Sequence, residues 1–352
     1  MQLRAPDGGH RKGQGGTMDE IPAFWSGAME QLGTLDLRVL AERVGGLRAL
    51  QEGESALVAA GVPRARASAW SRASPRRTRG IALPFDDPRY PVRLRDIPCP
   101  PPVVLVEGEI SAISDRAVAI VGTRRCTAYG KAIARKLAHE LASRGIVVVS
   151  GLARGIDGQA HLSALAVGKT VAVLGHGLAH TAPVCHDRLR AQILDHGGAL
   201  LSTWHDAVEP RPHTFPVRNA WISGLSEAVV VVEAPARSGA LLTAGAAADQ
   251  GREVFAVPGP VGAEESRGCL DLIAAGAQVL VDVEEFVRRW GGAPLATEFW
   301  LQRLFLGATI DEVAADTGRS VRQIRVDLVR LEMEGKVVKL PGERYSPGRG
   351  WR

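Results

Sequence analysis

The sequence predicts an α/β protein built on a doubly wound, mostly parallel sheet, with a small N-terminal helical domain before it and a C-terminal winged-helix domain after it. Short apolar runs alternate along the chain with segments of helical pattern, which is typical of a parallel sheet with helices between the strands. The runs are apolar throughout, which indicates strands covered on both faces. Seven such runs predict buried strands at 118–121, 146–149, 171–174, 199–201, 228–232, 253–257 and 277–281. Because ligands of these sheets bind at the carboxyl ends of the strands, the turns that follow them are the first candidates for a site.

The turn after the first strand has the features of an anion site. Gly122, Thr123, Arg124 and Arg125 follow the strand, and a helical pattern runs from about residue 128 to 143. A helix start offers unpaired N–H groups and a partial positive charge, and a guanidinium matches the geometry of a phosphate. We therefore expect a phosphate here, although a solvated surface with paired arginines would give the same pattern.

A second turn follows the next strand and brings Ser150, Gly151 and Arg154 to the same edge of the sheet. Asp157 and His161 come after it, one turn apart on a helix. A helix cap and a packed side chain explain this pair more simply than acid–base catalysis does. Both interpretations stay open from the sequence alone.

Two further turns complete the candidate site. Phe215, Arg218 and Asn219 precede a predicted helix that ends near residue 224, where they face a ligand or only brace the loop. The pair at 238–239 begins a helix of small residues through Ala248, which carries Thr243 and offers another helix N-terminus.

Motifs for cofactors and metals are weak or absent. The Gly168-Lys169-Thr170 run resembles the end of a P-loop, but it lacks the upstream glycine and a strand follows it. No G-x-G-x-x-G motif opens the first helix, and the four cysteines form no Cys-x-x-Cys pair. One loop carries four candidate metal ligands, His176, His180, Cys185 and His186. Glycines interrupt this loop, so the sequence fixes no ligand geometry for a metal. We expect no cofactor, no metal and no disulfide framework.

The motifs occur together in a known order. The segments VAIVGTRR, SGLARGIDGQAH, VAVLGHG, FPVRNAWISGLSEAVVVVEA, SGALLTAGAAADQGREVFAVPG and LIAAGA span residues 84–287. This series resembles the DNA-processing protein A family, DprA, also called Smf. The resemblance implies a Rossmann-like domain and a non-enzymatic, homodimeric protein that binds single-stranded DNA. It also implies protection of incoming DNA and loading of the RecA recombinase during natural transformation.

The resemblance assigns nucleic-acid or phosphate binding to one set of residues at the strand ends and assigns catalysis to none. The set is Gly122, Thr123, Arg124, Arg125, Ser150, Gly151, Arg154, Phe215, Arg218, Asn219, Ser238, Gly239 and Thr243. Three positions depart from the family pattern: Ala220 replaces an arginine, His186 an asparagine and Thr203 a frequent glutamate. These departures predict either a lower affinity for DNA or an unchanged affinity in which Arg125 or Arg154 compensates for the lost cation.

The chain divides into four predicted parts. Residues 1–20 are Gly-rich and polar, which predicts disorder. Residues 21–80 predict several short helices, similar to a SAM or helix-hairpin-helix domain, followed by an arginine-rich linker at 64–79. Residues 81–292 form the Rossmann-like domain and residues 297–352 the winged helix. The first helical part is an interaction module or, alternatively, a second DNA contact.

The winged-helix prediction rests on a capping box at Ser320 and Gln323 before an amphipathic helix. Its buried side should carry residues 321, 324, 328 and 331, leaving Arg322 and Arg325 outward. Such a helix enters a major groove or contacts a protein, and acidic residues nearby leave both interpretations open.

Charge and hydropathy narrow the partners. Residues 81–294 carry 21 basic and 22 acidic side chains, so DNA bound there needs a localised pocket rather than a broadly basic surface. The N-terminal 17 residues have no apolar core of a secretion signal, and no apolar run approaches the roughly 18 residues of a membrane span. We expect a cytoplasmic protein without a membrane partner.

Two alternatives belong to other functional classes. One is a nucleotide hydrolase related to cytokinin-activating phosphoribohydrolases, with Asp157, His161 or Glu233 supplying acid–base chemistry. Against it, the Pro-Gly-Gly-x-Gly-Thr loop of those enzymes is absent. The other is a winged-helix regulator whose central domain senses a nucleotide.

Overall fold

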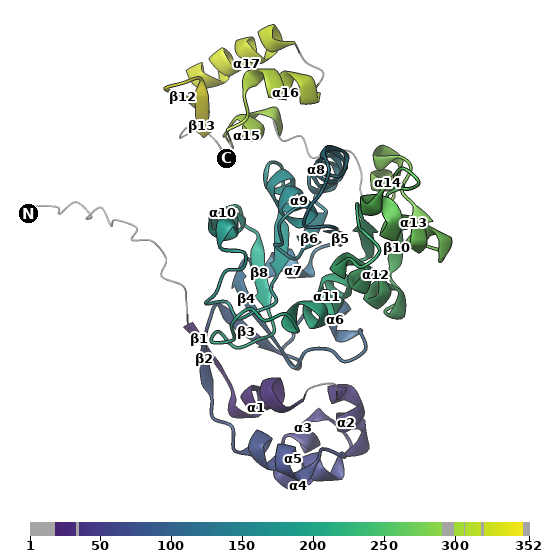
Figure 1. The fold of residues 1–352 in the computed structure, drawn as a ribbon. Helices are drawn as coiled ribbons and strands as arrows, with labels where there is room; N and C mark the ends of the chain where they lie inside the picture. The colour runs from purple at the N-terminus through teal and green to yellow at the C-terminus, as the bar shows by residue number, and fades with distance from the viewer. Residues whose placement is uncertain (1–17, 33–34, 291–298, 306, 318–319, 348–352) are drawn as a thin grey trace, which may run out of the picture.

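A computed structural model describes residues 18–32, 35–290, 299–305, 307–317 and 320–347. Figure 1 shows three parts in chain order: a helical module, a large sheet domain and a small C-terminal domain. Of the predicted disordered N-terminus, residues 1–17 lie outside the described residues. Residues 18–20 are not disordered, because strand β1 (Met18–Ile21) pairs antiparallel with β2 (Arg76–Arg79).

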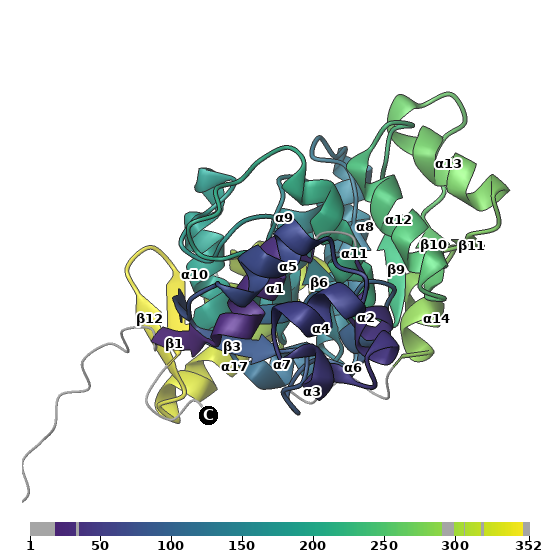
Figure 2. The same ribbon diagram turned by 90° about the horizontal axis from the view of Figure 1, so that it is seen from below.

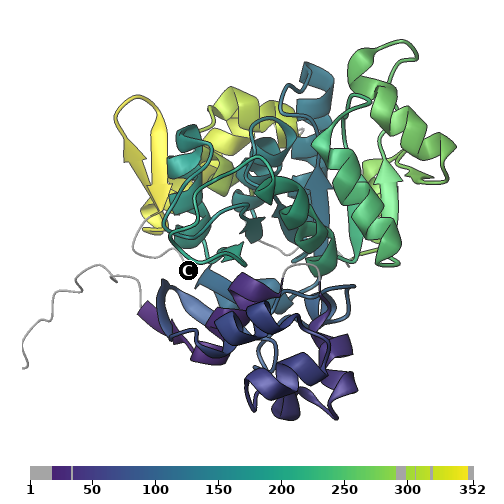
Figure 3. The ribbon, with the colours of Figure 1, turned by 60° about the horizontal axis from the view of Figure 1, so that its bottom comes forward.

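The N-terminal module consists of five short helices: α1 (Ala23–Gln31), α2 (Leu37–Arg43), α3 (Leu47–Leu50), α4 (Glu54–Ala59) and α5 (Arg64–Ser71). The prediction of a linker at 64–79 was wrong, since these residues contain α5 and β2. Ala67 and Trp70 are buried on one side of α5, and the Trp70 indole N–H donates to the Phe24 carbonyl at 2.8 Å. Apolar residues at helical spacing between the arginines therefore make this segment part of the module (Figure 3).

The central sheet has nine strands in the order β11-β10-β9-β5-β6-β7-β8-β4-β3. Seven are parallel and confirm the predicted strands: β5 (Ala117–Val121), β6 (Val147–Ser150), β7 (Thr170–Val173), β8 (Ala199–Ser202), β9 (Ala228–Val231), β10 (Glu253–Ala256) and β11 (Gln278–Val279). Two strands that the sequence analysis did not predict extend one edge antiparallel: β3 (Ile81–Pro84) and β4 (Val103–Gly108).

Helices cover both faces of this sheet, as the buried strands require. One face packs against α8 (Ala128–Ala142), α9 (Ile156–Leu165) and α14 (Val283–Arg288), and further along against α10 (Asp187–Asp195). The other face packs against α6 (Val92–Arg95), α11 (Thr214–Leu225), α12 (Gly239–Asp249) and α13 (Arg267–Ala274). A short helix, α7 (Ile110–Ser114), connects β4 to β5. Figure 2 shows α13 and β11 at one end of the molecule.

The sheet changes direction at β5. From β5 the chain adds β6, β7 and β8 on one side, and it then returns to add β9, β10 and β11 on the other. The two connections leave β5 in opposite directions, which opens a crevice at the carboxyl ends of β5 and β9. The fold therefore places its ligand-binding crevice between these two strands.

The C-terminal domain has the winged-helix elements: α15 (Phe299–Phe305), α16 (Ile310–Thr317), α17 (Val321–Met333), β12 (Val337–Leu340) and β13 (Arg344–Pro347). The predicted capping box is confirmed, with the Ser320 side chain accepting from the Gln323 amide. Ile324, Leu328 and Leu331 of α17 are buried in a core of this domain's own. Arg322 and Arg325 are exposed, as predicted.

Candidate nucleic-acid interface

A pocket of about 630 Å³ lies at the carboxyl ends of β5, β6 and β9. The turns after these strands and the helices α11 and α12 line it, so it occupies the crevice where the sheet changes direction. Ten of the thirteen predicted site residues line it: Gly122, Thr123, Arg124, Arg125, Phe215, Arg218, Asn219, Ser238, Gly239 and Thr243.

The first turn presents two exposed arginines on a backbone that hydrogen bonds hold in place. The Thr123 amide donates to the Glu233 carbonyl at 2.7 Å, and the Thr123 carbonyl accepts from the Ile156 amide at 3.2 Å. Arg124 and Arg125 are exposed and line the pocket. The sheet thus fixes the backbone while both guanidinium groups stay available to a ligand.

Helix α8 does not supply the anion site that the sequence predicted. The Glu233 carboxylate already occupies its N-terminus, accepting from the Thr127 amide at 2.8 Å and from the Thr127 hydroxyl at 2.6 Å. Because the Glu233 carboxylate already compensates the partial positive charge at the start of α8, we expect no phosphate to bind at this helix end. Gly122 also has an internal role, because a Cβ there would lie 2.6 Å from the Ile156 side chain.

The second turn contributes none of its three predicted site residues to the lining of the pocket. Ser150 is fully buried and donates to the Ile120 carbonyl at 2.6 Å. Gly151 is covered by a guanidinium, since a Cβ there would lie 2.4 Å from Arg218 Nη1. Arg154 is exposed, but it does not line the pocket. Ser150 and Gly151 therefore have packing roles in the described structure, and DNA binding by Arg154 stays a prediction.

Arg218 is a buried cation at the back of the pocket. It is only 4% exposed, and its guanidinium donates to the Gly151 carbonyl at 2.8 Å and to the Val173 carbonyl. Burial lowers the pKa of Arg218 to about 10, opposed by the attraction of Asp157. The residue lies inside α11, which begins at Thr214, and does not precede the helix as the sequence suggested.

Asp157 is the charge that accompanies Arg218. Its carboxylate is buried and accepts from the Gly151 amide at 3.1 Å and, more weakly, from the Ala153 amide at 3.4 Å. Burial raises the pKa of Asp157, while Arg218 acts in the opposite direction. Asp157 also lines the pocket, and its Oδ2 accepts both of these hydrogen bonds from the second turn.

His161 is a packed neutral histidine. The Thr170 hydroxyl donates to the Val148 carbonyl, so His161 Nδ1–H donates to that hydroxyl at 2.7 Å, and Nε2 accepts from the Leu152 amide at 3.3 Å. Burial is the main cause that lowers the pKa of His161 to about 3. The structural interpretation of Asp157 and His161 fits these contacts better than acid–base chemistry does.

Phe215 forms the aromatic part of the pocket wall. The guanidinium carbons of Arg124 and Arg218 lie 5.8 Å and 5.9 Å from its ring centroid. A Cβ on Gly175 would come within 2.7 Å of the ring, so this glycine makes room for it. The half-buried ring and the two guanidinium groups over it thus form one positively charged, partly aromatic wall.

The opposite wall is the start of α12. Ser238 caps this helix by accepting from the Ala240 amide at 3.3 Å, and Thr243 is buried one turn further on. Asn219 joins the two walls, since its side-chain amide donates to the Gly239 carbonyl at 3.0 Å. A Cβ on Gly239 would meet no atom within 4 Å, so the space above it is open to a ligand.

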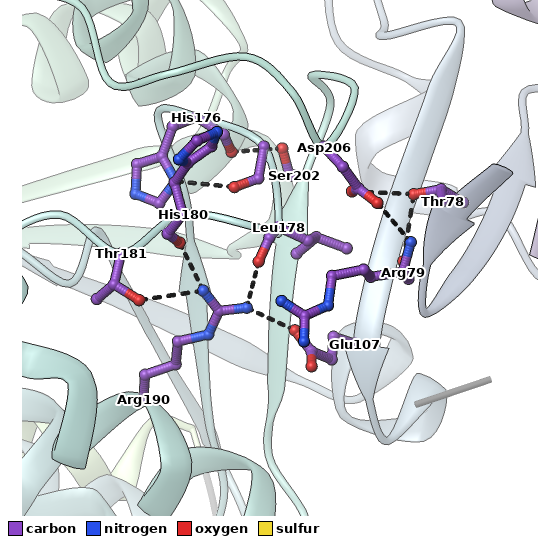
Figure 4. A network of polar contacts seen from close by, with 11 residues as sticks. Thr78, Arg79, Glu107, His176, Leu178, His180, Thr181, Arg190, Ser202 and Asp206 are labelled. Carbon is purple, nitrogen blue, oxygen red and sulfur yellow. Dashed lines mark hydrogen bonds and ion pairs between the residues drawn. The ribbon is translucent and has the colours of Figure 1, made fainter. Parts of the chain in front are cut away.

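Arg211 is a pocket residue that the sequence analysis missed. It is exposed and lines the pocket between Pro210 and Pro212. The loop before it is anchored to β2: the Asp206 carboxylate accepts from the Thr78 hydroxyl at 3.1 Å and from the Arg79 amide at 2.6 Å (Figure 4). The sequence around Arg211 has no helical or strand periodicity. Its position between two prolines is the signal that could have identified it.

Arg190 organises the loop that carries the histidines. Its guanidinium donates to Glu107 at 2.6 Å and to the carbonyls of His180 and Leu178 (Figure 4). His186 instead contacts the Leu152 carbonyl through Nδ1 at 2.8 Å. Within the described residues, no three His, Cys, Asp or Glu side chains form a group that could hold a metal.

The other two departures from the family pattern do not line the pocket. The Ala220 carbonyl accepts from the Gln250 side chain at 2.8 Å. The Thr203 hydroxyl is buried and has no hydrogen-bond partner in the part of the chain that the structure describes. Neither position places a charge in the pocket, where the exposed cations are Arg124, Arg125 and Arg211.

Comparison with known proteins explains why these features occur together. Residues 82–291 match the family model described as "DNA recombination-mediator protein A". The chain belongs to the DprA/Smf family. Its residues 307–343 also match the DprA winged helix domain, in agreement with the C-terminal fold.

Members of the DprA/Smf family resemble this chain over most of its length. Protein Smf of Escherichia coli K12 is 40% identical over 282 residues, covering 74% of this chain and 75% of the relative. DprA of Bacillus subtilis is 41% identical over 215 residues, covering 59% and 71%.

Two solved DprA structures share the fold. The Streptococcus pneumoniae protein superposes with a TM-score of 0.66 at 29% identity, covering 77% of this chain and 99% of that one. The Helicobacter pylori protein, whose structure was described for its single-stranded DNA binding mode, has a TM-score of 0.55 at 28% identity and covers 60% and 95%. Among the described helices, none is long and apolar enough to cross a membrane.

Proposed function

We propose that this DprA/Smf protein binds single-stranded DNA in the pocket between β5 and β9. The observation that carries the proposal is that three exposed arginines, Arg124, Arg125 and Arg211, line one pocket together with the half-buried ring of Phe215. Cations that follow a phosphate backbone, together with a ring on which a base stacks, are the features of single-strand binding sites.

The dimensions of the pocket favour a single strand over a duplex. A volume of about 630 Å³ admits one or two nucleotides, whereas the bases of a duplex are stacked inside the helix and cannot reach Phe215. The three arginines are clustered at one site in a domain with no net basic excess, so affinity should be local and sensitive to salt.

Fluorescence anisotropy with a labelled oligonucleotide, as a single strand and as its duplex, tests this proposal. We expect preferential single-strand binding that Arg124→Ala weakens and Arg188→Ala leaves unchanged, because Arg188 is exposed on α10 and outside the pocket. Equal affinity for both forms, or equal binding by both variants, would place the DNA elsewhere.

We infer that the bound strand is incoming DNA in natural transformation, which the protein protects in the cytoplasm and passes to the recombinase RecA. Membership of a family of recombination mediators supports this role, and a homodimer would place two pockets along one strand. A nuclease-protection assay and a RecA filament assay on the same strand test the two activities, with Arg124→Ala expected to lose both. Normal RecA loading by that variant would separate loading from this pocket.

The hydrolase alternative has less support. Glu233 caps α8, Asp157 holds the second turn, and His161 is a buried neutral side chain. These contacts give each of the three a structural role, and they favour binding over proton transfer to a ligand. We therefore propose a non-catalytic binding protein, and turnover of nucleoside monophosphates that Asp157→Asn abolishes would contradict it.

A further inference from the structure

The third helix of the winged-helix domain, α17, has apolar residues on its solvent side. Val326, Val329 and Met333 are 62%, 58% and 85% exposed. At about 100° per residue, these three lie on the side of the helix opposite the buried Ile324 and Leu328. They therefore form an exposed apolar stripe on the helix that a DNA-binding winged helix would insert into a groove.

A surface groove runs along this side of α17, lined by Val321, Arg322, Arg325, Val326 and Val329. Met333 continues the stripe beyond it. We call this set, with Met333, the α17 face. It lies in the C-terminal domain, apart from the residues that line the pocket of the central sheet (Figure 1).

The two arginines give the α17 face a positive charge. Arg325 lies 3.6 Å from Glu343 in the wing, with both side chains more than half exposed, so this pair is weak. Arg322 has no ion pair among the residues that the structure describes. An acidic group approaching the face meets one unpaired cation and one that exchanges its partner readily.

The apolar content of this face argues against a duplex-DNA ligand. A helix that reads bases presents side chains that hydrogen-bond to base edges and phosphates. Three large apolar side chains would instead cover those polar groups without replacing their hydrogen bonds to water. A ligand that buries the valines and also meets the arginines must carry apolar groups and negative charge together.

We propose that the α17 face is a docking site for an acidic peptide segment that carries apolar side chains. The apolar side chains occupy the groove over Val326 and Val329, and the carboxylates meet Arg322 and Arg325. The charge of the arginines determines the sign of the partner, and the exposed stripe supplies the contact area. This site does not depend on DNA binding in the central pocket.

The test is fluorescence anisotropy of the full chain with three labelled peptides. The first alternates Asp with Leu and Phe, the second has Asn at each Asp, and the third has Ser at each apolar residue. We expect the first peptide to bind at least about tenfold more tightly than either control, with an affinity that falls as salt is raised. Absence of binding, or equal binding by all three peptides, would overturn the proposal.

Variants of the α17 face locate the binding. Val326→Glu should abolish peptide binding and Val326→Lys should weaken it much less, because both lose the apolar contact but only glutamate repels the carboxylates. Position 326 is exposed, so the fold tolerates either side chain. Arg322→Ala should weaken binding, whereas Arg330→Ala on the same helix and Val261→Ser, 93% exposed in the central domain, should leave it unchanged. Equal loss in the two Val326 variants would contradict charge complementarity. Duplex DNA binding that Arg322→Ala removes would assign the face to DNA.

Discussion

Arg218 donates a 2.8 Å hydrogen bond to the carbonyl oxygen of Gly151, so a single buried guanidinium joins α11 to the turn after β6. The same guanidinium attracts the buried carboxylate of Asp157 through its opposite charge, and that carboxylate accepts from the amide of the turn. Arg218, which its motif assigns to DNA binding, thus also stabilises the interior of the protein. Its removal will change the pocket before any DNA is present.

The Arg218–Asp157 pair should show strong coupling in stability. Arg218→Gln and Asp157→Asn should each lower the free energy of unfolding by about 3 kcal/mol, because each leaves an unpaired buried charge. The double variant should lose at least about 1 kcal/mol less than the two losses together. Urea unfolding measures this coupling.

The exposed ion pair Arg267–Asp271 is the control for that experiment. Its Nε–Oδ1 distance is 3.0 Å, yet both side chains are at least half exposed. Arg267→Gln should change stability by less than about 0.5 kcal/mol. A cost for Arg267→Gln as large as that for Arg218→Gln would mean that burial is not the cause.

The exposed arginines of the pocket should determine the salt dependence of DNA binding. Arg124→Ala, Arg125→Ala and Arg211→Ala should each reduce the slope of log affinity against log salt by about 0.7 for a single strand, with unchanged thermal unfolding. Anisotropy titrations over a salt series measure the slope. An unaltered slope for Arg211→Ala would remove the proline-flanked wall from the DNA path.

Gly239 and Gly245 separate ligand contact from helix stability. A Cβ at either position of α12 meets no atom within 4 Å, but only Gly239 lines the pocket. Gly245→Ala should raise stability by up to about 1 kcal/mol and leave DNA affinity unchanged, since alanine favours a helix interior. Gly239→Ala should keep the fold and weaken DNA binding. Equal affinities in the two variants would show that the strand stays away from the start of α12.

His161 should make the protein sensitive to acid. Its pKa is about 3 in the folded protein and 6.5 in the unfolded chain, so the unfolded chain binds the proton first as pH falls below 6.5. Stability from this group is complete above pH 6.5 and is lost towards about pH 3, by at most about 1.4 kcal/mol per pH unit. The raised pKa of Asp157 acts in the opposite direction, its contribution falling as pH rises.

Urea unfolding of wild type and His161→Gln between pH 7.5 and 4.5 tests this dependence. The variant is expected to be less stable at neutral pH, because Thr170 and Leu152 lose their partner, but to depend less on pH. Equal slopes in the two proteins would mean that His161 is not the group that titrates.

The strand pattern and the motifs predicted the architecture and the edge of the sheet where the pocket lies. The apolar runs that became β5 to β11 are short and continuous, and each ends in a glycine-bearing or polar turn. The antiparallel β3 and β4 were missed: β3 pairs with the next strand, β4, but β4 joins the sheet through a partner far along the chain. β4 pairs with β8, a contact between residues 105 and 202 that no local pattern indicates.

The direction of individual side chains was the part that sequence could not give. Ser150 and Arg218 are in the motif, but their orientation depends on carbonyls of Ile120 and Val173, which belong to other strands. The capping of α8 by Glu233 likewise joins residues 106 positions apart. Such long-range hydrogen bonds decide which polar residues face a ligand and which satisfy the backbone.

The hydrogen bonds from Thr78 and Arg79 to Asp206 mean that the modules cannot be separated cleanly at residue 80. A protein shortened to residues 82–291, the span of the family match, would lose β2 and leave the Asp206 carboxylate without these two donors. The loop that carries Arg211 would then be tethered at fewer points. DNA affinities measured on such a shortened protein would belong to a pocket whose Arg211 loop is less firmly held. A protein that begins before β1 would keep the hydrogen bonds from Thr78 and Arg79 to Asp206.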